Sequence, residues 1–249
     1  MPYTNRFDGL LMSGRVPRIA FRSSRHLETL MVKQERAART RRSLIRAAAE
    51  VFAREGFVPA SLTTISRRAG VSNGALHFHF DTKEALARAV EEEAGREVRL
   101  LAERCRTEGA ETLQLLVDAT HALMRGLDES VVVRAGFELS GDISRTGGLD
   151  LRRQWRRWIE SVLRSAASEG SLADGVSPDD VACAVMAATV GFEVLGARDD
   201  KEWISRRTLA RFWELILPRI AARRVLDTVV TCGSCSPVAL PGLCVEKPA

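Results

Sequence analysis

The chain has 249 residues, of which 45% are apolar and 28% are charged, and its net charge is +5. This length can bury one or two hydrophobic cores. No apolar run approaches the roughly 20 residues that span a bilayer, and the N-terminus lacks the short apolar core of a signal peptide. We therefore expect a soluble cytoplasmic protein with no membrane partner.

The first 30 residues mix Gly, Pro, Ser and Arg without sustained periodicity, and we expect a disordered extension there. We hypothesise that it reflects a start codon upstream of Met31, which N-terminal sequencing of the native protein would test. Residues 1–46 hold eleven Lys or Arg against three Asp or Glu. This positive charge has two explanations, a solvated basic tail and neutralisation of DNA phosphates. Only the pattern of residues 40–83, described next, favours the second.

Residues 40–83 carry the pattern of three short helices. The first has one apolar stripe and ends at Gly56, a natural C-cap. Ser61 can cap the second helix, which ends at Gly70, and Ser72 can cap the third. Two short helices joined by a tight turn form a helix-turn-helix, which places its second helix in the major groove of DNA.

The run S-L-x-x-I-x-x-x-A-G-V-S-x-G-A-L-x-F-H-F-x-x-K-E-x-L, from Ser61 to Leu86, resembles the DNA-binding domain of TetR-type transcriptional repressors. In a helix-turn-helix the third helix faces base edges, while flanking hydroxyl and cationic groups hold phosphates. The expected groove residues are Ser72, Asn73, Gly74, Ala75, His77 and His79. The expected phosphate contacts are Thr40, Arg41, Thr63, Thr64 and Lys83, and the alternative is that these are simply exposed polar residues.

Individual residues of the third helix leave alternatives open. Asn73 can read an adenine edge or hold a phosphate, and Ala75 can touch a thymine methyl group. Many members of the TetR-type family that residues 61–86 resemble have tyrosine at the position of His77. We therefore expect the contact of His77 with DNA to be weaker or dependent on pH. The alternative for His79 is a histidine at the edge of the core.

The rest of the chain predicts a second, larger helical domain. Asp81 and Glu84 resemble a capping box, and the long helix after them is the expected mechanical link between the two domains. Amphipathic patterns predict further helices over residues 113–127 and 131–139 and after Asp150, with a loop between the last two.

The last two predicted helices are unusually apolar. The first of them has a clear N-terminal signal at Ser177-Pro178, where a capping serine is followed by a proline in the first turn. Two such helices near a C-terminus suit a dimer formed by a four-helix bundle. The alternative is burial within one subunit.

The predicted fold is all-α. Its parts are a disordered extension at 1–30, a helix-turn-helix domain with its linking helix at 31–98, a ligand-binding and dimerisation domain at 99–222, and a disordered tail at 223–249. The chain has five cysteines, an odd number, and no secretory context, so we do not expect a disulfide framework. Cys232 and Cys235 form a C-x-x-C without a second pair or a nearby histidine, so we expect neither a metal nor a cofactor.

Within the TetR-like proteins, the second domain most resembles the γ-butyrolactone autoregulator receptors. The motifs are V-V-R-A-G-F-E-L at 132–139, Q-W-R-R-W at 154–158 and T-V-G-F-E-V-L-G at 189–196. The resemblance implies that Trp155 stacks on a lactone in an apolar pocket. The expected walls are Phe137, Trp158, Val162 and Met186, and the alternative is that all five are ordinary core residues.

These features predict a dimer that binds a palindromic operator in double-stranded DNA and is released by a small apolar effector. Our function hypothesis is a repressor of secondary-metabolite genes that answers to a γ-butyrolactone. Other proteins of this architecture answer to antibiotics or biosynthetic intermediates, and an architectural DNA binder without a ligand is a further alternative. We do not expect an enzyme, because the chain shows no recognisable spacing of nucleophile, base and orienting group and no glycine-rich phosphate loop.

Overall fold

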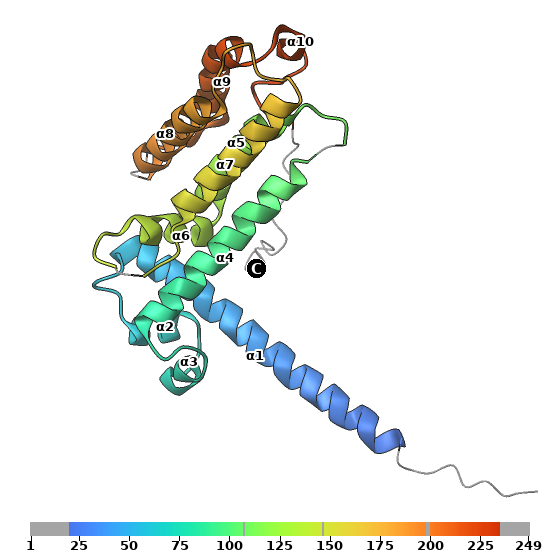
Figure 1. Cartoon of the computed structure of the whole chain (residues 1–249). Helices are drawn as coiled ribbons and strands as arrows, with labels where there is room; N and C mark the ends of the chain where they lie inside the picture. The colour runs from blue at the N-terminus through green and yellow to red at the C-terminus, as the bar shows by residue number, and fades with distance from the viewer. Residues whose placement is uncertain (1–19, 107, 146, 198–199, 235–249) are drawn as a thin grey trace, which may run out of the picture. The chain divides into compact units, whose positions relative to one another are not determined.

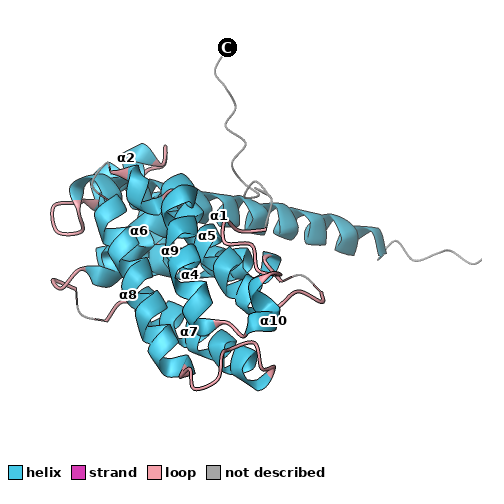
Figure 2. Ribbon diagram, turned by 90° about the horizontal axis from the view of Figure 1, so that it is seen from above, coloured by secondary structure: helices cyan, strands magenta, loops and turns pink. Residues whose placement is uncertain are grey.

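The computed structural model describes residues 20–106, 108–145, 147–197 and 200–234. Within these ranges every regular element is a helix, as Figures 1 and 2 show. In chain order the elements are α1 (Ala20–Glu55), α2 (Leu62–Arg68), α3 (Asn73–His79), α4 (Lys83–Arg104), α5 (Thr112–Glu129), α6 (Val131–Gly141), α7 (Leu151–Ser168), α8 (Pro178–Gly196), the 3₁₀ helix η1 (Lys201–Ile204), α9 (Arg206–Ile220) and α10 (Arg223–Leu226). The all-α prediction is confirmed for this part of the chain, and none of its helices is long and apolar enough to cross a membrane.

The chain forms two compact units, residues 1–42 and 43–249. In the first unit the described residues belong to α1, which begins at Ala20. Residues 20–30 are therefore helical where we expected disorder, and residues 1–19 lie outside the described part. In the second unit, the domain boundary predicted near residue 98 falls inside α4, which is continuous there.

The ends of the first helices follow from local chemistry. Gly56 ends α1 with a φ of +81°, and Gly70 makes the turn after α2 with a φ of +68°, conformations that glycine adopts without a steric penalty. Ser61 and Ser72 accept hydrogen bonds from backbone amides three residues on, at 3.1 and 3.2 Å. The predicted caps of the helix-turn-helix are thus confirmed.

The start of α4 differs from the prediction by one residue. Thr82 is the N-cap, and its hydroxyl accepts from the amide of Ala85 at 3.0 Å. Asp81, which we expected to cap this helix, is exposed and precedes the cap. The predicted caps of α7 and α8 are confirmed, because Asp150 accepts from the Arg153 amide and Ser177 from the Asp180 amide.

Close packing of α4 against α6 joins the linking helix α4 to the body, which we define as the helices from α5 to α10 together with the C-terminal residues that follow them, up to residue 234. A Cβ atom at Gly136 would lie 2.3 Å from the Cβ of Ala94, which is far inside van der Waals contact. Because only glycine permits this approach, the two helices meet almost backbone to backbone. Deeper in the body, the indole N–H of Trp213 donates to the hydroxyl of Thr120 at 2.9 Å, so this fully buried tryptophan also satisfies its polar atom.

The C-terminal strap, which we define as residues 223–234, corrects the predicted disordered tail. Val225 and Val229 are buried, and the amide of Val230 donates to the side chain of Gln114 at 2.6 Å. Ser234 donates to the carboxylate of Asp118 through its amide and its hydroxyl. The prediction is therefore wrong for residues 223–234, while residues 235–249, with Cys235, lie outside the described part.

Candidate nucleic-acid interface and effector pocket

Helix α3 divides into a buried and an outward surface. Leu76 and Phe80 pack into the core of the head, which we define as residues 43–83, and they are 0% and 5% exposed. The outward positions include four of the predicted groove residues. These are Ser72, Asn73, Gly74 and His77.

The side-chain amide of Asn73 already makes one hydrogen bond within the protein. Its side-chain oxygen accepts from the hydroxyl of Ser66, which ties α3 to α2. Its two amide hydrogens are the groups best placed to donate to an outside acceptor. This arrangement favours a phosphate or a base acceptor over the paired contact with an adenine edge, which also needs the oxygen.

Neither Ala75 nor His79 lies fully on the outward surface, because both are half-buried. The imidazole of His79 lies between the rings of Phe78 and Phe80, with centroid distances of 5.2 and 6.5 Å. This position agrees with the core-edge alternative for His79. Groove contact by His79 therefore has less support than contact by His77.

Phe78 is an outward residue that the sequence analysis left out. Its side chain is 81% exposed, which is unusual for a large aromatic residue. Helical periodicity could have found it, because a residue two places from Leu76 and two from Phe80 falls on the opposite side of the helix.

Two predicted phosphate contacts on α2 differ in their surroundings. Thr63 is exposed, so its hydroxyl is open to a phosphate. The hydroxyl of Thr64 lies 2.9 Å from that of Ser61 and takes part in the helix cap. Thr40 and Arg41 belong to the other compact unit, where both are half-buried on α1, and their phosphate contacts stay predictions.

Lys83 has a structural role that the sequence did not reveal. Its ammonium group donates three hydrogen bonds, of 2.8, 2.9 and 3.0 Å, to backbone carbonyls in the turn between α1 and α2. The acceptors are Phe57, Val58 and Ala60. Because an ammonium group has three donors, this geometry does not support the predicted phosphate contact, and we leave Lys83 out of the interface.

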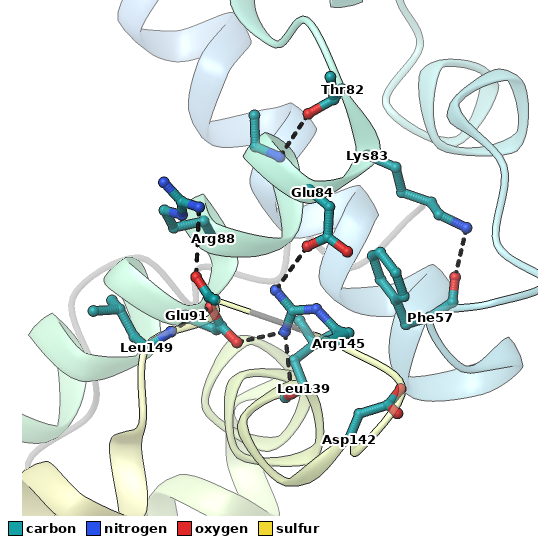
Figure 3. Close-up of polar contacts among 12 residues, drawn as sticks. Phe57, Thr82, Lys83, Glu84, Arg88, Glu91, Leu139, Asp142, Arg145 and Leu149 are labelled. Atoms are coloured by element: carbon teal, nitrogen blue, oxygen red, sulfur yellow. Dashed lines mark hydrogen bonds and ion pairs between the residues drawn. The ribbon is translucent and has the colours of Figure 1, made fainter.

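The junction between head and body is built around Arg145, which lies in the loop between α6 and α7 (Figure 3). Its guanidinium group lies over the ring of Phe57, 5.0 Å from the centroid, and Lys83 lies over the same ring at 4.5 Å. The guanidinium group of Arg145 also lies 3.3 Å from the carboxylate of Glu84 in the first turn of α4. Arg145 thus connects the body to the head and to the linking helix.

A buried ion pair holds this junction. The Arg145 and Glu91 side chains are 2% and 0% exposed, and their nearest atoms are 2.5 Å apart. The other carboxylate oxygen of Glu91 accepts from the amide of Leu149 at 3.0 Å. A Cβ at Gly148 would lie 2.6 Å from this carboxylate, so a glycine is required where the loop passes the pair.

An apolar cavity of about 220 Å³ lies in the body and is lined by residues of α4, α6 and α7. The rings of Trp155 and Trp158 stack in its wall, with centroids 4.8 Å apart and planes 12° apart. The indole N–H of Trp155 is buried and has no hydrogen-bond acceptor among the residues that the structure describes. The lining residues are Gly95, Val98, Arg99, Ala102, Phe137, Leu151, Gln154, Trp155, Arg157 and Trp158.

Three of the five predicted pocket residues, Phe137, Trp155 and Trp158, meet in this cavity. Val162 and Met186 do not line it, so the structure does not bring them together with the other three, and their ligand contacts stay predictions. Val162 is buried in the core farther along α7, and Met186 lies on α8 and packs partly buried against the core. The physical reason is that α4, rather than α8, supplies the facing wall.

Two other cavities, of about 270 Å³ each, are lined largely by charged and polar side chains. Burial raises the pKa of Glu138 in one of them and lowers the pKa of His121 in the other. Because both cavities are rich in charge, they suit an apolar effector less well than the tryptophan-lined cavity does.

The sequence pattern of bacterial regulatory proteins of the tetR family matches residues 44–90, which include α2 and α3. The A-factor receptor protein of Streptomyces griseus is 34% identical to the chain over 194 residues, which are 77% of this chain and 67% of that receptor. The chain belongs to the tetR family of bacterial regulatory proteins.

Solved structures of other TetR-family proteins share the architecture. The crystal structure of a γ-butyrolactone receptor, an ArpA-like protein, has a TM-score of 0.68 and 30% identity and covers 79% of this chain and 96% of its own. CprB from Streptomyces coelicolor, solved in complex with its biological operator sequence, has a TM-score of 0.63 and 31% identity and covers 76% and 92%. The likeness to the TetR family and to γ-butyrolactone receptors that the motifs indicated is confirmed.

Proposed function

We propose that this TetR-family protein is a ligand-responsive repressor rather than an enzyme and that it acts in the cytoplasm. It binds a palindromic operator as a dimer, is released by a γ-butyrolactone-type signal, and controls secondary-metabolite genes, including antibiotic genes. The observation that carries the proposal is the position of α4. One part of this helix lines the tryptophan cavity at Gly95, Val98 and Ala102, while its first turn contacts the head through Lys83.

An effector in the cavity would act on α4 directly. The stacked tryptophans offer an apolar surface, and the buried N–H of Trp155 offers one donor for a carbonyl or hydroxyl oxygen. A ligand that fits only a shifted position of α4 would stabilise that position. Two recognition helices must meet major grooves about 34–36 Å apart, so a change in their spacing would release the operator.

We assign dimerisation to α8 and α9. Both helices expose large apolar side chains in the single chain, with Val194 at 50%, Leu195 at 46% and Leu215 at 73%. The two helices meet where the rings of Phe192 and Phe212 pack edge to face. A two-fold pairing of this surface would bury it in a four-helix bundle.

A mobility-shift experiment tests the proposal. An operator would first be selected from random double-stranded DNA with the full chain, and the complex would then be titrated with an A-factor-type γ-butyrolactone. We expect specific binding and release by the lactone. Failure to select any specific sequence would contradict the repressor assignment.

Substitutions at Trp155 separate a receptor from a DNA binder without a ligand. Trp155→Ala should keep operator binding and lose release, whereas Trp155→Phe, which keeps the ring stack and removes the N–H, should weaken release partially. Trp203→Ala is the matched control, because Trp203 lies on η1 outside the cavity. Normal release from Trp155→Ala would contradict the cavity as the effector site.

The alternative effector, an antibiotic or a biosynthetic intermediate, uses the same cavity. It would release the operator in the same assay while the lactone would not. In that outcome the repressor assignment stands and the lactone assignment is wrong.

A further inference from the structure

The outward surface of α3 carries a polar stripe and an apolar stripe side by side. Asn73 and His77 are four residues apart, and so are Gly74 and Phe78, so each pair shares one face of the helix. All four positions are exposed. The apolar stripe consists of a bare backbone at Gly74 followed one turn later by a whole phenyl ring.

The ring of Phe78 is exposed and contacts one neighbouring ring. It packs against the imidazole of His79 at 83° with the centroids 5.2 Å apart, while 81% of the residue remains accessible. Gly74 lies one turn before Phe78 on the same face of the helix. A Cβ at Gly74 would find only the Ser72 hydroxyl within 4 Å, at 3.9 Å, which leaves open space beside the ring.

This surface suits the major groove of DNA better than it suits water. Exposure of a phenyl ring is unfavourable in water, and the hydrophobic residues packed on the other side of α3 are buried. The residues around α3 carry a net positive charge, since residues 61–83 contain three Arg or Lys against Asp81 alone, although Lys83 is held by backbone carbonyls and Arg68 pairs with Glu50. An apolar ring on α3 matches the one apolar group that base edges present in the major groove, the C5 methyl group of thymine.

We propose that Phe78 is a specificity-determining residue that reads the methyl group of one thymine in each half-site of the operator. The inference rests on the proposed binding of operator DNA through α3. It assigns the base preference at this position to an apolar contact, whereas Asn73 and His77 contact the DNA through hydrogen bonds. A cytosine at the same position presents no methyl group and is discriminated against.

The test replaces thymine by deoxyuridine, which removes only the methyl group. Each thymine of the selected operator would be replaced in turn, in both half-sites together, and the affinity of the full chain measured by fluorescence anisotropy. One thymine position should lose about fourfold per half-site, the effect of exposing one methyl group worth about 0.8 kcal/mol. Across the palindrome the loss should be about 15-fold.

Variants then link that methyl group to Phe78. Phe78→Ala should bind the thymine operator about as weakly as the wild-type chain binds the deoxyuridine operator, and it should not distinguish the two duplexes. Phe78→Leu keeps an apolar side chain and should retain part of the discrimination. Val58→Ala is the matched control, because Val58 is also a large exposed residue of the head, at 67%, but lies in the turn between α1 and α2.

Three results would overturn the inference while leaving the proposed function intact. The first is an operator that binds specifically but shows no thymine sensitive to loss of its methyl group. The second is a Phe78→Ala variant that still discriminates between the duplexes as the wild-type chain does. The third is a Phe78→Ala variant that binds DNA with unchanged affinity, which would mean that the ring contacts something other than DNA. Failure to select any operator would instead remove the proposed function together with the inference.

Discussion

The head and the body of the second unit hold their polar groups in different ways. In the head, from residue 43 to Lys83, the caps of Ser61 and Ser72 and the contacts of Lys83 join partners 3 to 26 residues apart. The body also has local pairs such as Gln114 with Asp118, but two buried carboxylates pair with groups of the body over far longer separations. Glu91 meets Arg145 across 54 residues, and Asp118 meets Ser234 across 116.

The two regions therefore depend on the sequence in different ways. The proposed DNA-binding surface belongs to the seven-residue helix α3, whose caps and turn are formed by residues adjacent to it in the sequence. The tryptophan-lined cavity and the junction exist only after helices distant in sequence have packed together. Loss of a long-range buried pair should therefore cost much more stability than loss of a local cap.

Arg145→Ala should give the largest effect. It would leave the carboxylate of Glu91 buried without its cation, and breaking a buried ion pair costs about 3–5 kcal/mol. The measurement is the free energy of unfolding from urea denaturation. Arg156→Ala is the control, because Arg156 and Glu160 form an exposed pair and such pairs contribute at most about 1 kcal/mol.

A double variant decides whether the loss comes from the uncompensated charge. Glu91→Leu combined with Arg145→Met removes both charges and should recover much of the stability, because apolar replacements of a buried pair are often neutral. If the double variant were less stable than Arg145→Ala, the other contacts of Arg145, with Phe57 and Glu84, would be the more important ones.

Removal of the C-terminal strap should rank second. A chain that ends at Ala222 loses the buried side chains of Val225 and Val229 and the hydrogen bonds to Gln114 and Asp118, a loss of about 2–4 kcal/mol. A chain that ends at Ser234 keeps all of these contacts, and we expect little change from it. Equal stability of the two truncated chains, measured by thermal unfolding, would mean that the strap does not stabilise the body.

The caps and the helix-turn-helix were predictable because their chemistry is local. Ser61, Gly70 and Ser72 act on residues within one turn, so their identities and spacing carry the structure. The same reasoning failed by one residue at α4, since Asp81 and Thr82 are both good caps and only packing selects between them. It failed for the strap because neither its apolar residues nor Gly233 and Ser234 carry any sign of a partner on α5.

The site was predictable in part for the same reason. Phe137, Trp155 and Trp158 came from short motifs, and the cavity brings them together. Its facing wall on α4, with Gly95 and Val98, carried no motif, and helical periodicity alone cannot say which helix packs opposite. Lys83 shows the reverse error, because its charge indicated a phosphate contact while the folded chain uses it to hold a turn.

The corrected start of α4 gives a smaller, local effect. Thr82→Ala removes the hydroxyl that accepts from the Ala85 amide and should cost about 1 kcal/mol, whereas Asp81→Ala should cost less because Asp81 precedes the cap. Urea unfolding of the two variants decides between them. A larger loss from Asp81→Ala would restore the capping box that the sequence predicted.

The smallest expected effect is a pH dependence of the strap through His121, whose ring nitrogen donates to the carbonyl of Thr231 at 2.9 Å. Burial is the main cause that lowers the pKa of His121, and the charges of Arg206 and Arg125 lower it further, while the Thr231 carbonyl and Asp118 raise it. The unfolded chain, in which this histidine titrates near 6.5, therefore binds the proton more readily than the folded protein. The stability that neutral His121 contributes is fully present above about pH 6.5 and is lost as the pH falls from there to the lower pKa of the folded protein.

The variant His121→Gln isolates this contribution. Glu97 and Glu138 have pKa values raised by burial, so their protonation favours the folded state as the pH falls, but both chains share them. Between about pH 7.5 and about pH 5.5 the wild-type free energy of unfolding should fall by more than that of His121→Gln. If the two chains responded equally, His121 would not sense pH in the fold, and the contact between α5 and the strap would be as indifferent to protonation as the local caps of the head.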